Sequence, residues 1–330
     1  MISVMGKSFR AGERGIVRLP VTTMATGQPL EIALHVLAGK APAPVAALVA
    51  AHHGDEVFAL EVIRTVTQRL ASIEPLGTII LVPMANPTAF EAGTRHTPLD
   101  MMNLNRVFPG RKDGWLSEQL AAALTDALLG RLDLLVDFHS GADATEVDYT
   151  YTRPRTSDLT RRIHELALLT GARALWETPL PAGTLAGEAE RRGIPWCVIE
   201  SGGSPSFGTD RLSWTADRTV DVLRAAGVVP GTPRASEAEV VIRDGMAVRP
   251  SCGGLLVPSH GGEIMGRPIA KGTVVGTIYS PHTFEELEVL RAPYDQSYVM
   301  MARTRPSRVH AGDYGYLFGN GATAENLRGA

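Results

Sequence analysis

The stretch V-A-A-L-V-A-A-H-H-G-D-E, residues 45–56, decides the fold that we predict for this chain. Its first seven residues are apolar without interruption, which favours a strand covered on both faces, as in a parallel sheet. Residues 57–70 then carry apolar side chains at spacings of three, three and four, the pattern of an amphipathic helix. Ligands bind at the carboxyl ends of strands in open α/β sheets, so the polar H-H-G-D-E segment lies where functional residues collect.

Two of these polar residues, His53 and Glu56, are three positions apart across the predicted strand-to-helix turn. We expect Gly54 to let the backbone curl so that both side chains point at one centre. Neutral imidazole and carboxylate are good zinc ligands, although an isolated H-x-x-E is common on solvated helix faces. His52 is expected to point elsewhere and to pack or support a ligand, while Asp55 either caps the helix or positions a ligand.

The composition is that of an ordinary globular protein and excludes several partners. The 330 residues are 44% hydrophobic and 20% charged, with a net charge of -3, which suits one large domain or one domain plus a small one. No basic block recommends nucleic acid or an anionic membrane surface, and no apolar stretch is long enough to span a bilayer. The N-terminal residues lack the apolar core of a signal peptide, which favours a cytoplasmic location.

The two cysteines, Cys197 and Cys252, are far apart in the sequence. We interpret both as buried thiols in a reducing compartment, not as a disulfide.

Further elements follow from the apolar and turn patterns along the chain. We predict a hairpin in residues 16–36, a buried strand at 77–83, and a long irregular segment at 84–111. An irregular segment of this length inside a compact domain is usually functional. Ser117 is the expected N-cap of a helix that ends at Leu129.

The second half of the chain continues the alternation of strands and helices. Strands are expected at 132–138 and 196–199, helices at 158–170, 184–192 and 211–226, and a polar, aromatic loop at 142–155. This order predicts an α/β fold with a mostly parallel or mixed sheet covered by helices. From residue 239 on, short extended runs are cut by Gly and Pro, which indicates a small all-β domain. We therefore divide the chain into residues 1–232 and 233–330.

Two more polar residues, His139 and Glu200, stand at the ends of predicted strands. A lone histidine in D-F-H is more often a hydrogen-bonded core residue than a ligand. Together with His53 and Glu56 at a second strand end, however, His139 favours a metal site. Three protein ligands with an open fourth position are typical of catalytic zinc.

Five motifs in this order resemble the succinylglutamate desuccinylase/aspartoacylase family, a branch of the zinc carboxypeptidase superfamily. They are H-G-D-E at 53–56, N-P-T-A-F at 86–90 followed by Arg95, N-L-N-R-V-F-P-G at 103–110, D-F-H-S-G at 137–141 and E-S-G-G at 200–203. The resemblance covers residues 45–203, and the C-terminal β region also resembles the small domain that follows in this family.

The resemblance implies a zinc carboxypeptidase-like fold and specific roles for seven residues. It assigns one zinc per chain to His53, Glu56 and His139, and it makes Glu200 the general base and acid. It also implies that Asn105 and Arg106 bind a substrate carboxylate and that Arg95 contacts the scissile carbonyl oxygen. A solvated loop position stays an alternative for Arg95, as does a strand-end cap for Glu200.

One position departs from the family pattern. Asn103 stands where the family often has an Asp that orients a zinc-bound imidazole, and an amide accepts that proton less strongly. Asp137 is the alternative partner for such an imidazole. Arg191 and Arg192 are further candidates for binding the substrate.

The β region also resembles the barrel-sandwich fold of biotinyl and lipoyl carriers. A carrier needs a lysine at the tip of an exposed hairpin, and the corresponding stretch here, Y-S-P-H-T-F-E-E at 279–286, has none. We therefore expect no covalent cofactor and interpret this region as a lid or oligomerisation module.

The family resemblance implies a zinc-dependent amidohydrolase that removes the acyl group from a small N-acyl amino acid or a related carboxylate. A metallocarboxypeptidase acting on a short peptide and a non-catalytic ligand-binding protein with the same fold remain alternatives. The expected partner is a small molecule, without nucleic acid or membrane, and a homo-oligomer is left open.

Overall fold

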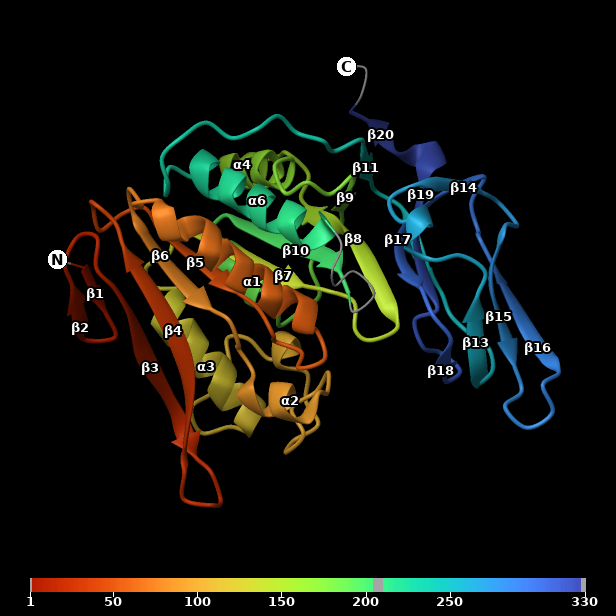
Figure 1. Cartoon of the computed structure of the whole chain (residues 1–330), viewed down its shortest axis with the longest axis horizontal. Helices are drawn as coiled ribbons and strands as arrows, with labels where there is room; N and C mark the ends of the chain where they lie inside the picture. Colours follow the sequence, from red (N-terminus) through yellow and green to blue (C-terminus); the bar gives the residue numbers. More distant parts are fainter. Residues whose placement is uncertain (1, 204–209, 328–330) are drawn as a thin grey trace.

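The computed structural model describes residues 2–203 and 210–327 of the chain. Figure 1 shows a twisted sheet with helices on both faces and a strand-rich region beyond its right-hand edge. The helices are α1 (Val57–Arg69), α2 (Pro87–Ala92), α3 (Leu116–Leu128), α4 (Asp158–Ala167), α5 (Leu185–Arg191) and α6 (Asp210–Ala225), with short 3₁₀ turns η1 (Leu70–Ser72), η2 (Leu104–Arg106), η4 (Gly262–Ile264) and η5 (Gly321–Thr323).

The strands of the first 203 residues are β1 (Ile2–Val4), β2 (Lys7–Phe9), β3 (Arg14–Thr23), β4 (Pro29–Ala38), β5 (Val45–Val49), β6 (Thr78–Val82), β7 (Leu134–His139), β8 (Thr145–Thr152), β9 (Ala174–Glu177) and β10 (Trp196–Gly202). Within the large sheet, the strands of this part of the chain lie in the order β8-β10-β7-β5-β6-β4-β3. The centre, β10-β7-β5-β6, is parallel, and β4 and β8 pair antiparallel on either side. The predicted α/β class with a mixed sheet is confirmed.

The central strands are buried on both faces, as their uninterrupted apolar sequences predict. On one face Leu48 and Val136 pack with α1 and α6, which contribute Phe58, Val62 and Leu223. On the opposite face α3 and α5 cover a second core, which contains Leu120, Leu124, Leu185, Ile80 and Val198. The two helical layers hold the carboxyl ends of β5, β7 and β10 in a fixed relation to one another.

The structure corrects three local expectations. The segment expected to be irregular contains α2, because the Asn86 side chain caps the backbone N–H of Ala89 and Pro87 occupies the first turn. Ser117 is not the N-cap of α3. Trp115 holds that position, where its N–H donates to the carboxylate of Glu118, while the buried hydroxyl of Ser117 contacts Thr97 and Asp100.

The expected loop at residues 142–155 is wrong as well, since it forms β8. The sequence T-E-V-D-Y-T-Y-T reads as a strand by its alternation and its β-branched and aromatic residues. Strand β9 also follows a segment for which no strand was predicted, and it pairs parallel with β8.

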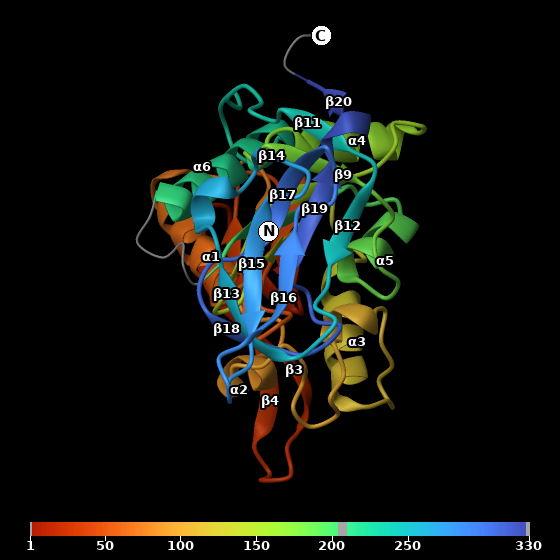
Figure 2. The ribbon, with the colours of Figure 1, turned by 90° about the vertical axis from the view of Figure 1, so that its right-hand side faces the viewer.

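The C-terminal strands are β11 (Val240–Ile242), β12 (Gly245–Val248), β13 (Gly254–Pro258), β14 (Pro268–Ala270), β15 (Val274–Tyr279), β16 (Glu286–Arg291), β17 (Gln296–Arg303), β18 (Ser307–Val309), β19 (Tyr316–Asn320) and β20 (Glu325–Asn326). A four-stranded sheet, β16-β15-β13-β18, packs against β17 and β19 over an apolar core, and Figure 2 shows this layer face on. Because β17 pairs with β8, the large sheet includes strands from both sides of the domain boundary that we placed after residue 232. That boundary stays a prediction.

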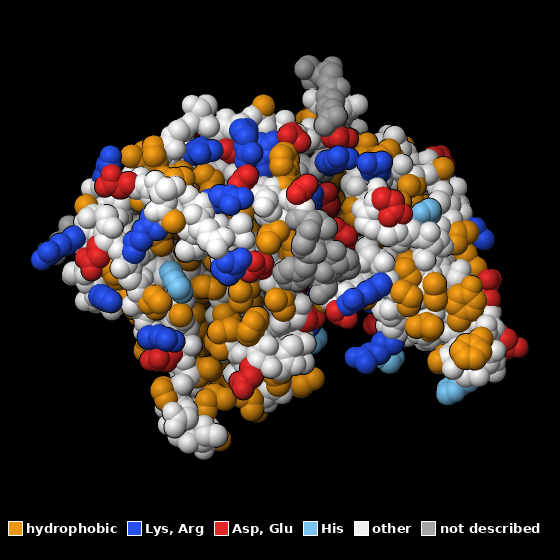
Figure 3. Space-filling view, in the orientation of Figure 1, with side chains coloured by type: hydrophobic (Ala, Val, Ile, Leu, Met, Phe, Trp, Pro, Cys, Tyr) orange, Lys and Arg blue, Asp and Glu red, His pale blue; other side chains and the backbone are white. Residues whose placement is uncertain are grey.

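The cysteines and the surface add two observations. Both thiols are free, but only Cys197 is buried, whereas Cys252 is half-buried, so the expectation of two buried thiols is wrong for the second. Charged side chains of both signs are mixed over the face drawn in Figure 3. Within residues 2–203 and 210–327, no helix combines the length and apolarity needed to cross a membrane.

Candidate metal centre

The carboxyl ends of β5 and β7 bring His53, Glu56 and His139 together. The Nδ1 atoms of His53 and His139 lie 2.6 and 2.9 Å from the two carboxylate oxygens of Glu56. One potential ligand atom from each residue falls within 4.8 Å of the others, and all three residues are buried. Two imidazoles and a carboxylate that converge in this way match the donor set of catalytic zinc.

The turn after β5 is fixed by its contacts with α2. The Gly54 N–H donates to the carbonyl of Thr94, and a Cβ on Gly54 would lie 1.9 Å from the carbonyl oxygen of Ala89. Gly54 is therefore required by this close approach and not by the curled backbone that we expected. Glu56 is the residue just before α1, which directs its carboxylate back toward His53.

The charge states of the three residues follow from burial and from their charged neighbours. Burial lowers the pKa of His139, but Glu56 and Asp137 outweigh it and hold that pKa well above its usual value. Burial lowers the pKa of His53 to about 4 despite the nearby Glu56, so this imidazole is neutral near pH 7. Burial raises the pKa of Glu56, but the two histidines outweigh it and hold that pKa well below its usual value. A neutral imidazole and an ionised carboxylate are the forms in which these side chains bind a metal.

Asparagine side chains contact the outer nitrogens of both imidazoles. The Nε2 of His53 lies 3.0 Å from Asn103 Oδ1, which also accepts the N–H of Asn105 and is thereby oriented. Asn103 thus occupies the orienting position in which the family often has Asp. The Nδ2 of Asn105 lies 3.0 Å from His139 Nε2, and its Oδ1 accepts the N–H of Leu185.

The two expected arginines lie beside this cluster and are exposed to solvent. Arg95, with 45% of its side chain exposed, places Nη1 3.1 Å from Glu56 Oε1. Arg106 donates from Nη1 to the carbonyl of Asn105 at 2.6 Å. Arg191 and Arg192, in contrast, both pair with Glu188.

Glu200 is placed beside the cluster by strand pairing. It is in register with His139 on the parallel neighbour β7, so both side chains leave the same face of the sheet. Burial raises the pKa of Glu200 to about 7; His139 and Arg95 oppose this rise, and Glu56 adds to it. A carboxyl group with a pKa in this range is suited to take up and release a proton near neutral pH.

Asp55 was expected either to cap α1 or to position a metal ligand, and it makes a side-chain hydrogen bond to neither. No side-chain hydrogen bond caps α1, and Asp55 Oδ1 is buried without a hydrogen-bond partner. Burial and then the neighbouring Glu56 raise its pKa.

Tyr149 and Tyr151 are site-lining residues that the sequence analysis missed. They lie on β8, Tyr149 is in antiparallel register with Glu200, and the Tyr151 ring stacks on Trp176 at 5.4 Å between centroids. Burial raises the pKa of Tyr151 well above its usual value, and the nearby Glu200 raises it further. Recognition of the Y-T-Y alternation as a strand would have brought both residues to this sheet edge.

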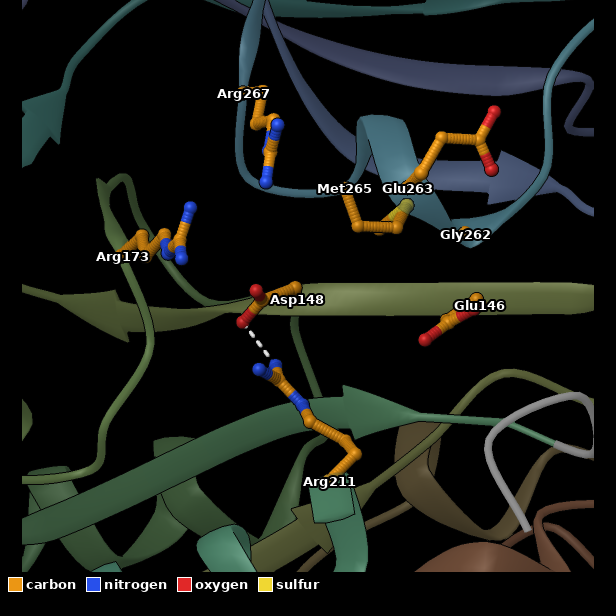
Figure 4. A pocket seen from close by; sticks show the side chains of 8 residues that line it. All are labelled: Glu146, Asp148, Arg173, Arg211, Gly262, Glu263, Met265 and Arg267. Carbon is orange, nitrogen blue, oxygen red and sulfur yellow. Dashed lines mark hydrogen bonds and ion pairs between the residues drawn. The ribbon is translucent and has the colours of Figure 1, made fainter. Parts of the chain in front are cut away.

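A separate cavity of about 220 Å³ lies where β8, α6 and the η4 segment meet (Figure 4). Its lining combines three arginines with three acidic residues, and Asp148 faces Arg211, which also donates to Ser201. None of the proposed metal ligands lines it. We interpret it as a polar junction between the two parts of the chain.

Solved structures of known proteins share this architecture over nearly their whole length. A protein of Ruegeria pomeroyi, described as the product-bound ectoine utilization protein EutE (DoeB), superposes with a TM-score of 0.83 and 27% identity over 97% of this chain and 98% of that one. A succinylglutamate desuccinylase/aspartoacylase of Rhodobacter sphaeroides gives a TM-score of 0.79 and 25% identity over 94% and 96% of the two chains.

Sequence comparison gives the family itself. The model of the succinylglutamate desuccinylase/aspartoacylase catalytic domain matches residues 42–226, and the chain belongs to this family. It is also 28% identical to the N-alpha-acetyl-L-2,4-diaminobutyric acid deacetylase of Halomonas elongata over 308 residues, which cover 91% of this chain and 84% of that protein. The family resemblance inferred from the five motifs is confirmed.

Proposed function

We propose that this protein is a zinc-dependent amidohydrolase that removes the acyl group from a small N-acyl amino acid. The observation that carries the proposal is the buried convergence of His53, Glu56 and His139, with Glu200 in register beside His139. The deacetylase activity in the name of the Halomonas elongata relative supports the same class of reaction.

The residues at the cluster fit a metal by their chemistry. Two buried imidazole nitrogens face both oxygens of one carboxylate, and three acceptors of this kind in one place favour a shared cation. His53, Glu56 and His139 would hold it. Bound there, zinc supplies a Lewis acid for an amide carbonyl and increases the acidity of a water molecule.

The other residues receive roles from their positions. Glu200 takes a proton from the attacking water and passes it to the leaving amine, as its raised pKa permits. Arg95, beside Glu56, stabilises the negative charge that develops on the carbonyl oxygen. Arg106 pairs with the substrate carboxylate through its planar guanidinium, and Asn105, whose NH₂ lies 3.0 Å from His139 Nε2, binds the same carboxylate.

The substrate class separates this proposal from its alternatives. A deacylase anchors the carboxylate of the amine product, whereas a carboxypeptidase anchors a peptide C-terminus and accepts longer chains. The named activity of the Halomonas elongata relative favours deacylation of an N-acetyl amino acid with a second polar group. A cytoplasmic location and the oligomeric state stay predictions.

The test is an activity screen of the zinc-loaded protein. We expect release of a free amine from N-acetyl and N-succinyl amino acids, little release of C-terminal residues from short peptides, and no activity in the His53→Ala variant. Faster cleavage of peptides than of N-acyl amino acids would support the carboxypeptidase. Inactivity of the zinc-loaded protein on both panels would support the non-catalytic alternative.

A further inference from the structure

His52 is a fully buried histidine that none of the roles above uses. It precedes the proposed ligand His53, is 0% exposed, and stacks on the ring of His139 with centroids 5.5 Å apart. Its Nε2 lies 2.9 Å from Oδ1 of Asp137, which is itself 0% exposed. A buried histidine–carboxylate contact next to a candidate metal centre calls for an explanation, because burying polar groups is costly.

The direction of this hydrogen bond follows from the chemistry of its partners. An ionised carboxylate only accepts, so His52 Nε2 carries the proton and donates it to Asp137. The other ring nitrogen, His52 Nδ1, is buried and has no hydrogen-bond partner among the described residues. The Nε2 N–H of His52 is therefore committed to Asp137.

The second oxygen of Asp137 is directed toward His139. Asp137 Oδ2 lies 3.6 Å from His139 Nε2, and it is buried without a hydrogen bond. The Asn105 group nearest to this nitrogen is an NH₂, because the amide oxygen of Asn105 accepts the Leu185 N–H. An NH₂ donates and does not accept.

Metal binding through His139 Nδ1 would change what its Nε2 requires. A neutral imidazole that gives its Nδ1 lone pair to a metal carries its proton on Nε2 and needs an acceptor there. Asn105 Nδ2 cannot be that acceptor, whereas the unpartnered Asp137 Oδ2 can. A small rotation of the His139 ring would turn the 3.6 Å contact into a hydrogen bond.

We propose that His52 is a positioning residue that acts through Asp137 to orient His139 for the metal. The inference rests on the proposed metal centre and adds a three-residue chain, His52–Asp137–His139, in which each carboxylate oxygen accepts one imidazole proton. His52 fixes the carboxylate, and the carboxylate fixes the ligand ring. Asp137 thus supports His139, while Asn103 takes the corresponding place at His53.

The same three residues could in principle hold a second ion, because their ligand atoms also fall within 4.8 Å of one another. Burial argues against it. His52 and Asp137 are completely enclosed and leave no coordination position for water. The proposed zinc ligand Glu56, in contrast, contacts the half-exposed Arg95. One metal per chain is therefore part of the proposal.

The experiment measures zinc dissociation constants by competition with a chromophoric chelator. We expect Asp137→Asn to weaken zinc binding about 10- to 100-fold, the range for partners of ligating histidines. His52→Phe, which keeps a ring but removes the donor, should weaken it in the same direction, and His52→Gln, which restores an N–H donor, should recover most of the affinity. In the Asp137→Asn background, His52→Phe should have almost no further effect.

His164→Phe is the matched control, since His164 is also buried and its ring Nδ1 lies 3.1 Å from the Thr152 hydroxyl oxygen. This variant should bind zinc as the wild type does. In the cobalt-loaded proteins, the visible absorption of His52→Phe should shift while that of His164→Phe should not. Thermal unfolding of each metal-free variant shows that the compared proteins are folded.

Three results would overturn the proposal. They are an unchanged zinc affinity in folded His52→Phe or in folded Asp137→Asn, additive losses in the double variant, and two zinc ions per wild-type chain. A wild-type protein that binds no zinc would refute the proposed function as well, so the two failures are distinguishable.

Discussion

The carboxyl-terminal edge of the sheet and the C-terminal β region are built in opposite ways. At the sheet edge, five adjacent polar side chains are buried and bonded to one another: His52, His53, Glu56, Asp137 and His139. Among the buried side chains of the described residues 240–327, only Ser297, Tyr298 and Tyr316 carry a polar group. The rest of this core consists of apolar groups such as Leu256 and Ile278.

This difference indicates which region carries chemistry. Burying charged and polar groups costs more than burying apolar ones, so a protein that needed only stability would fill the sheet edge with hydrophobic residues. The β region is built in that way, with an apolar core. Among its large apolar side chains, Phe284 in the turn between β15 and β16 is 77% exposed. We infer that the sheet edge is arranged for function at the expense of stability.

The largest effect on activity is expected at Glu200. Glu200→Gln keeps the size of the side chain but removes the proton carrier, so kcat should fall by a factor on the order of 10² to 10⁴. Zinc content should stay at the wild-type level because Glu200 is not one of the proposed ligands. A variant with near-normal kcat would move the base elsewhere, with the half-buried Asp55 as the next candidate.

Truncation of a core side chain in the C-terminal β region should lower stability without changing zinc binding. Leu256 is 0% exposed in the apolar core between the two C-terminal sheets. Leu256→Ala should lower the free energy of unfolding by about 2–5 kcal/mol, as is typical of a cavity in a core. Urea titration gives this value, and zinc affinity of the folded protein should not change. A loss of zinc affinity would break the comparison between the regions.

Arg106 tests whether the site reads a carboxylate. Arg106→Ala should weaken transition-state stabilisation, calculated from kcat/KM, by about 2 kcal/mol on an acid substrate. This is the lower end for the loss of one partner of a charge pair, because Arg106 is exposed. The matching amide, which lacks the charge, should lose less. Equal losses on the acid and the amide would show that Arg106 does not recognise the carboxylate.

The smallest effect is expected at the join between the two regions. Burial raises the pKa of Asp221 on α6, but hydrogen bonds from Arg234 and Arg224 outweigh it and hold that pKa below its usual value. A carboxyl with a depressed folded-state pKa contributes stability above its unfolded pKa, near 4, and this is lost as pH falls through the lower folded pKa.

The corresponding measurement compares wild type with Asp221→Asn. The difference in melting temperature should be present at pH 7 and should shrink below pH 4, because acid protonates Asp221 in the wild type. Asp217→Asn, on the same helix and paired with Arg69 at the surface, is the control. A difference that grows in acid would contradict the direction of the pKa shift.

Patterns of local sequence predicted the fold class and the residues that meet at the sheet edge. The apolar run before His53, and the strand before His139, suffice because parallel strands end at one edge. Contacts between distant segments could not be derived in this way. The need for Gly54 depends on the carbonyl of Ala89, and the partner of Asp137 depends on β5 and β7 being neighbours.

Other errors came from residues whose local preferences point in two directions. Ser117 is a good N-cap by type, but the exposed Trp115 holds that position and Ser117 is turned inward toward Thr97. Strand β8 mixes acidic residues with Thr and Tyr: Glu146 and Asp148 line the cavity of Figure 4, and Tyr149 is in register with Glu200. Its polar sequence resembles a loop until its neighbours are known.

The most direct test of the account is zinc K-edge X-ray absorption combined with metal analysis of the purified protein. We predict one zinc per chain, bound only by nitrogen and oxygen at about 2.0–2.2 Å, and loss of that zinc in His53→Ala. Sulfur ligands at about 2.3 Å, which would implicate the cysteines, or full zinc occupancy in His53→Ala would contradict the assignment of His53, Glu56 and His139.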